Sequence, residues 1–162
     1  MKLVFLSNFL NHHQLPLCQN LYAQLGENFW FVATEQIPQE RLSFGYADMN
    51  REYPFVIRTY EDAAQLKKAR QLTDEADVVV HGSAPMAFLQ HRLRAGKLTF
   101  LYSERLYRSG YEAWKLPVRL WRFWRNYGRY KSLYLLCASA FTAADFAKTF
   151  TFINKAYKWA HG

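Results

Sequence analysis

Four polar side chains come directly after apolar runs in this sequence. This is the pattern expected of residues at the ends of buried strands. His81 and Ser83 come after a run of three valines, and Glu104 and Arg105 follow the next strand-like run. Ligands of open α/β sheets bind outside the carboxyl ends of the strands, so all four are candidate site residues. An imidazole and a carboxylate can move a proton, which makes His81 and Glu104 the candidate catalytic pair.

Each of these residues also has a structural interpretation. His81 could be a buried histidine whose ring makes one internal hydrogen bond. Glu104 and Arg105 could pair with each other or cap the following helix.

A histidine pair, His12–His13, lies between the first apolar run and a helix whose first turn contains Pro16. Backbone N–H groups at a helix start favour anions, so the pair could contact an anion or a sugar; an incidental surface pair is the alternative. The turn lacks G-x-G-x-x-G, so we predict no NAD or FAD. No third ligand has suitable spacing, so we predict no metal site.

The elements that must position these residues alternate between strand and helix. Expected strands are Leu3–Leu6, Phe29–Thr34, Phe55–Thr59, Asp77–Gly82, Leu98–Tyr102, Leu133–Ala138 and a last one within Ala156–Gly162. Expected helices are Leu15–Leu25, Glu61–Leu72, one from Pro85 to Gly96 capped by Ser83, and Thr142–Lys148. Residues 35–54 are long for a loop and hold either a short helix or a mobile flap.

This alternation predicts an α/β fold. We expect residues 1–162 to form a single Rossmann-like domain, with an open, doubly wound parallel sheet of six to seven strands and helices on both faces. The expected strand order is 3-2-1-4-5-6 with right-handed crossovers.

Positive charge is concentrated in one stretch. Residues 92–131 hold eleven Lys or Arg against two acids, a net +9, while the whole chain carries +8. A helical wheel places Arg119, Arg122, Arg125 and Arg129 opposite an aromatic face. That aromatic face could pack on the sheet while the arginines meet water; alternatively, the helix docks on anionic lipid headgroups. Nucleic acid is a further anionic partner for such a stretch.

Targeting signals and disulfides are not expected. Cys18 and Cys137 lie in apolar periodic segments, where a thiol behaves as a small buried hydrophobe. The N-terminal apolar run turns polar at Ser7, too early for a signal peptide, and no apolar run approaches the roughly 20 residues of a membrane span. We therefore expect a cytoplasmic protein.

Four motifs carry a family resemblance: Asn11–Gln14, Tyr102–Leu106, Ala138–Phe146 and Lys155–Trp159. They resemble the N-terminal half of bacterial GT-B glycosyltransferases of the glycogen-synthase-like group. The resemblance implies a domain that presents a glycan or lipid-linked sugar acceptor, with His81 contacting the transferred sugar.

By the same resemblance, His12, His13, Ser83 and Arg105 would contact the acceptor. The nucleotide-sugar donor would bind a separate C-terminal domain, so this chain would hold no cofactor and would be inactive alone. The basic face would place the enzyme peripherally at the inner face of the membrane, with no specific nucleic acid as partner.

Two other functions compete. A non-catalytic α/β module that binds anionic membrane or nucleic acid explains the charge but leaves His81 and Glu104 without a role. A receiver-like or flavodoxin-like domain is disfavoured, because Ser7-Asn8-Phe9 provides neither an acidic pair nor a phosphate-binding loop. The acceptor, the donor sugar and the stereochemistry stay open.

Overall fold

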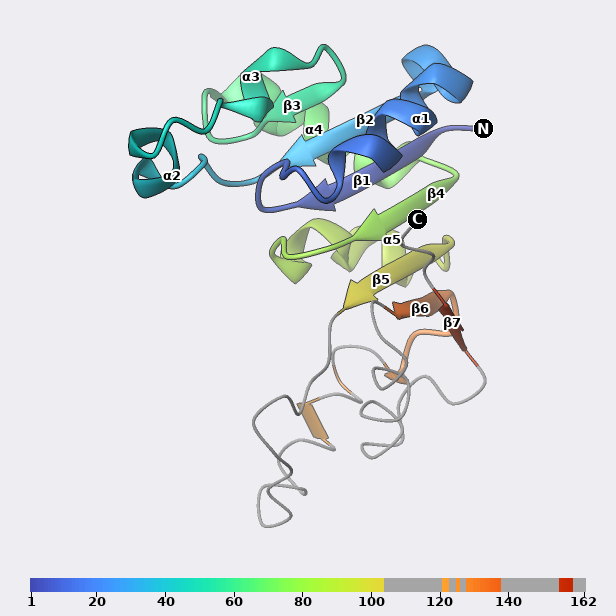
Figure 1. The fold of residues 1–162 in the computed structure, drawn as a ribbon. Helices are drawn as coiled ribbons and strands as arrows, with labels where there is room; N and C mark the ends of the chain where they lie inside the picture. The colour runs from blue at the N-terminus through green and yellow to red at the C-terminus, as the bar shows by residue number, and fades with distance from the viewer. Residues whose placement is uncertain (104–120, 123–124, 126–127, 138–154, 159–162) are drawn as a thin grey trace. The chain divides into compact units, whose positions relative to one another are not determined.

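The computed structural model describes residues 1–103, 121–122, 125, 128–137 and 155–158 (Figure 1). The chain divides into two units, Met1–Arg92 and Leu93–Gly162, and each is described by itself.

The first unit is built on a parallel sheet. Its strands are β1 (Leu3–Ser7), β2 (Phe29–Ala33), β3 (Val56–Arg58) and β4 (Val78–His81). Their spatial order is β3-β2-β1-β4, and every pair among them is parallel. All five residues of β1 are buried, as expected of a central strand covered on both faces. These four strands are those predicted from the sequence, in the predicted order.

Helices cover both faces of this sheet, with α1 in front of it and α4 behind it (Figure 1). The helical elements are α1 (Leu15–Leu25), η1 (Gly26–Asn28), α2 (Gln39–Ser43), α3 (Met49–Glu52), α4 (Ala63–Glu75), η2 (Met86–Leu89) and α5 (Gln90–Arg94). The architecture is therefore the predicted α/β, Rossmann-like, doubly wound one.

Local signals at α1 act as predicted. Pro16 lies in its first turn, and the helix ends at Gly26, whose φ of 57° suits glycine and whose N–H donates to the Tyr22 carbonyl. Cys18 is fully buried on the inner face of α1, and burial raises the pKa of its thiol to about 12. This cysteine is thus the buried hydrophobe that the apolar pattern indicated.

The connection from β2 to β3 contains two short helices, α2 and α3, so the short-helix alternative is confirmed. Asp48 caps α3 by accepting a hydrogen bond from the Asn50 N–H (3.1 Å).

One predicted cap is wrong. Ser83 does not cap the helix after β4, because that segment begins as the 3-10 helix η2 with Pro85 at its N-cap and no side-chain cap. The Ser83 N–H donates instead to the Ser7 hydroxyl (3.4 Å), a tertiary contact that local sequence does not encode.

Arg92 opens the basic stretch of the sequence, yet its side chain is fully buried. The guanidinium donates to the backbone carbonyls of Thr73 (3.1 Å), Ala76 and Asp77 (3.0 Å), where α4 ends. Burial lowers the pKa of Arg92 to about 10. A cation suits the carbonyl end of a helix, so this arginine stabilises the fold and adds nothing to a surface patch.

In the second unit, the described strands are β5 (Thr99–Ser103), β6 (Leu133–Cys137) and β7 (Ala156–Lys158). They pair in parallel in the order β5-β6-β7. The neighbours β5 and β6 are as predicted, whereas the predicted order gave no place to β7. The predicted helix at Thr142–Lys148 and most of the arginine helix lie outside the described residues.

Candidate functional site

A hollow opens beyond the carboxyl end of β1, between the β1–α1 loop and the β2–β3 connection. It holds about 240 Å³ of empty space, open solvent included. Its lining is mixed aromatic, polar and cationic: Phe9, Leu10, Asn11, His12, Ile37, Arg41, Tyr46, Ala47 and Met49. This is the edge of the sheet where α/β proteins bind ligands.

The β1–α1 loop holds the histidine pair in place through Asn11. The Asn11 side-chain oxygen accepts from the N–H groups of His13 and Gln14 (both 3.0 Å), which fixes the entry into α1. The rings of His12 and His13 lie 4.0 Å apart, and both residues are exposed. His12 lines the hollow, as the sequence placed it near a site, and the ring of His13 lies beside it, tilted by 41°.

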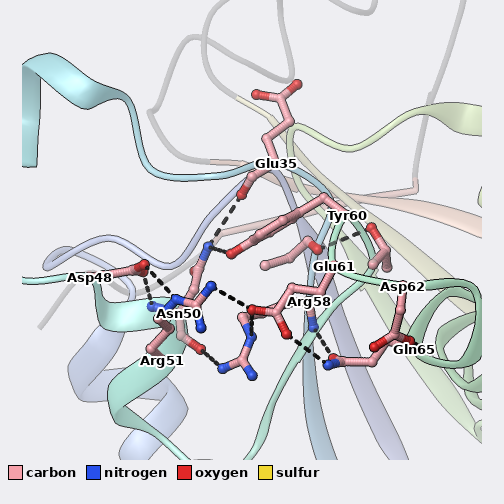
Figure 2. Close-up of polar contacts among 11 residues, drawn as sticks. Glu35, Asp48, Asn50, Arg51, Arg58, Tyr60, Glu61, Asp62 and Gln65 are labelled. Atoms are coloured by element: carbon pink, nitrogen blue, oxygen red, sulfur yellow. Dashed lines mark hydrogen bonds and ion pairs between the residues drawn. The ribbon is translucent and has the colours of Figure 1, made fainter.

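Asn50 ties the two walls of the hollow together, and Figure 2 shows its contacts with Glu35 and Tyr60. This fully buried side chain accepts from the Leu10 N–H (3.0 Å) and donates to the Glu35 carbonyl (3.2 Å) and the Tyr60 hydroxyl (3.1 Å). Burial is the main cause that raises the pKa of Tyr60, so its hydroxyl keeps its proton. One amide thus satisfies polar groups from three separate segments.

An ion-pair chain extends this network to β3 (Figure 2). Glu61 lies 2.9 Å from Arg58 Nε and 2.7 Å from Arg51 Nη2, and Asp48 lies 3.4 Å from Arg51 Nε. Arg58 also donates to the Asn50 carbonyl (3.2 Å). The Arg58–Glu61 contact is an ion pair without a directed hydrogen bond, because Nε has no hydrogen-bond partner among the described residues. Both arginines are therefore neutralised by carboxylates.

Sequence reasoning missed this network, although two capping signals pointed to its place. Asp48 marks the start of α3, and Asp62-x-x-Gln65 marks the start of α4. In the structure Asp62 accepts from the Gln65 N–H (2.7 Å), while the Gln65 side chain accepts from the Arg58 N–H (2.8 Å).

The turns after β1 and β4 meet, as expected where the chain reverses its winding direction. Gly82 donates to the Leu6 carbonyl (2.7 Å), and a Cβ on Gly82 would come within 2.9 Å of the Ser7 hydroxyl oxygen. Glycine at this position therefore permits the close approach of the two turns. Ser83 is exposed at this junction.

His81 is nearly inaccessible, with 3% of its surface exposed. Its Nε2 donates to the Ala84 carbonyl (2.7 Å), and Nδ1 has no hydrogen-bond partner among the described residues. Burial lowers the pKa of His81 to about 4, so the ring is neutral at pH 7. This imidazole holds the turn after β4, and its catalytic role stays a prediction.

The remaining predicted site residues belong to the second unit. Glu104, Arg105 and Arg119 lie outside the described residues. Arg122, Arg125 and Arg129 are exposed, and the Arg125 guanidinium lies 5.2 Å from the ring centre of Trp121. Trp121 itself is 59% exposed, so this tryptophan does not pack in a core.

Metal and membrane features were searched over the same described residues. They contain no group of three or more His, Cys, Asp or Glu side chains that could hold a metal ion. No helix among them is long and apolar enough to cross a membrane.

Comparisons with family models, curated proteins and solved structures find no match for this chain. The case for a function therefore depends on the site itself and on the motifs in the sequence.

Proposed function

We propose that this chain is the acceptor-binding domain of a glycosyltransferase, which presents a glycan or a lipid-linked sugar to a donor bound elsewhere. The observation that carries the proposal is the hollow beyond β1, where His12 and Asn11 lie beside the aromatic rings of Phe9 and Tyr46. Sugar hydroxyls need donors and acceptors, and the apolar face of a sugar ring suits an aromatic side chain.

The resemblance of Asn11–Gln14 and three later motifs to GT-B enzymes supports the same function. In this proposal His12, His13, Ser83 and Arg105 are the residues that contact the acceptor. His81 and Glu104 serve the transfer step, with a carboxylate able to take the proton of the acceptor hydroxyl. The nucleotide sugar binds a separate C-terminal domain.

Calorimetric titration of the full chain tests the proposal. We expect binding of oligosaccharides, weakened about tenfold by His12→Ala, and no measurable binding of UDP- or GDP-sugars. His91→Ala is the matched control, since His91 is an exposed histidine on α5 outside the hollow. Micromolar affinity for a nucleotide sugar, or equal effects of the two alanine variants, would overturn the acceptor-domain assignment.

A second candidate function is docking on an anionic membrane surface, and the exposed Trp121 beside Arg125 favours it. Tryptophan and arginine together suit the lipid headgroup region, and each cation near an acidic surface contributes roughly 1 kcal/mol.

Co-sedimentation with vesicles containing phosphatidylserine tests this candidate. We expect salt-sensitive binding that is lost when Arg119, Arg122, Arg125 and Arg129 are all replaced by Gln. Unchanged binding of that variant would mean that these arginines face solvent and do not contact the membrane. Equal affinity for DNA would instead indicate nonspecific attraction to any polyanion.

A further inference from the structure

The turn after α2 carries two large aromatic side chains that face solvent, and one of them, Tyr46, lines the hollow. Phe44 is 80% exposed and Tyr46 is 56% exposed, on the turn that follows α2. Gly45 reverses the chain there with a φ of 86°. The turn is held by its own backbone, since the Gly45 N–H donates to Leu42 and the Tyr46 N–H donates to Arg41 (both 3.1 Å). These aromatics are therefore presented on a defined turn.

Arg41 differs from the other arginines of the same connection. Arg51 and Arg58 are both paired with Glu61, whereas no carboxylate lies within ion-pair distance of Arg41 among the described residues. Its guanidinium lies 5.3 Å from the ring centre of Phe9, a cation–π distance that holds the cation at the hollow.

The hollow has no negative charge of its own. None of its nine lining residues is an acid. Two acids adjoin lining residues in the sequence. Asp48 caps α3 and pairs with Arg51, and Glu40 precedes Arg41 on α2, with no ion pair between these two neighbours among the described residues. An unneutralised guanidinium in a hollow without carboxylates attracts an anion, and its planar fork matches a carboxylate or a phosphate.

We propose that Arg41 selects an acidic saccharide as the acceptor, by pairing with its carboxylate or phosphate while a sugar ring lies against Tyr46. This inference rests on the proposed acceptor-binding function and names the substrate class. The hollow is a surface depression whose volume of about 240 Å³ includes open solvent, so it would contact one face of a charged sugar unit at the end of a glycan rather than enclose it.

Calorimetry with four probes tests the proposal on the full chain: tetragalacturonate, glucose 6-phosphate, inorganic phosphate and neutral maltotetraose. We expect an acidic saccharide to bind at least tenfold more tightly than maltotetraose at low salt. The preferred acidic probe identifies the anionic group as carboxylate or phosphate. Inorganic phosphate should bind more weakly than either acidic saccharide, because it lacks the ring that Tyr46 contacts.

Three variants locate the effect. Arg41→Gln should remove the preference for acidic probes by weakening their binding at least tenfold more than that of maltotetraose. Tyr46→Ala should weaken every saccharide. Lys67→Gln is the matched control, because Lys67 is an exposed cation on α4 outside the hollow. Each variant is first checked for an unchanged unfolding transition.

The outcomes separate the two proposals. Equal effects of Arg41→Gln and Lys67→Gln, with saccharide binding still sensitive to His12→Ala, would overturn acidic selection and leave the acceptor function standing. Binding of inorganic phosphate as tight as that of the saccharides would also overturn it. Absence of any saccharide binding would overturn both.

Discussion

Polar side chains at the carboxyl edge of the first unit fall into two groups that differ in how they are satisfied. Asn50, Arg58 and His81 are buried or half-buried, and each side chain makes at least one hydrogen bond within the protein. His12 and Arg41 are exposed at the hollow and have few partners. The first group should determine stability, because its polar atoms lose water on folding and need protein partners. The second group should determine binding, because exposed polar atoms with few protein partners remain available to a ligand.

Asn50→Ala should have the largest effect on folding. It leaves the Leu10 N–H, the Glu35 carbonyl and the Tyr60 hydroxyl without their partner, and a buried group without a partner costs about 1–3 kcal/mol. We expect the free energy of unfolding in urea to fall by roughly 3 kcal/mol. Asn20→Ala, on the exposed side of α1, should change it by less than about 0.5 kcal/mol. Similar values for the two variants would remove the distinction between the groups.

His81 should make stability depend on pH in a defined window. Its folded pKa of about 4 lies below the ordinary 6.5, so the unfolded state binds a proton first as the pH falls. Stability from this neutral ring is present above pH 6.5 and is lost between about 6.5 and 4, by up to roughly 3 kcal/mol.

Urea unfolding across that window measures the effect as the difference between the wild type and His81→Gln. The variant should show a flatter profile, while Asn20→Ala should keep the wild-type slope because it removes no titratable group. A His81→Gln profile as steep as the wild type would mean that other groups cause the acid sensitivity.

Glu61→Gln should have a smaller effect, because its partners are partly solvated. Its side chain is 21% exposed, Arg58 is 22% exposed and Arg51 is 60% exposed, so solvent screens both ion pairs. We expect a loss of about 1 kcal/mol that shrinks as salt is added. Glu27→Gln, an exposed carboxylate in η1, is the control and should be neutral. A salt-independent loss would indicate packing rather than charge.

Arg41→Gln should have the smallest effect on folding, within about 0.5 kcal/mol of the wild type. Arg41 is exposed and lacks a carboxylate partner among the described residues, so its replacement leaves no buried group unsatisfied. A destabilisation as large as that of Asn50→Ala would assign Arg41 to the structural group.

The strands of the first unit could be predicted because burial on both faces leaves a continuous apolar pattern, as in β1 and β4. The end of α1 could be predicted because Gly26 is a local signal. The role of Ser83 could not, since its contact with Ser7 joins residues 76 positions apart. The role of Asn50 could not be predicted for the same reason, because its three partners come from three segments that only the folded chain brings together.

Within the site, the sequence pointed to His12 and His13, which the structure places at and beside the hollow. It did not single out Arg41 or Tyr46. These residues lie in a connection with weak periodicity, and nothing local shows that Arg41 lacks an acidic partner while Arg51 has two.

Chemical-shift mapping tests the central claim, that the hollow beyond β1 is a saccharide site, most directly. The isotope-labelled full chain is titrated with tetragalacturonate and maltotetraose while the backbone amides are followed. We predict saturable shifts at Phe9–His13 and Arg41–Met49, with none along α4. Shifts confined to other elements, or no shifts with either saccharide at millimolar concentration, would contradict the claim.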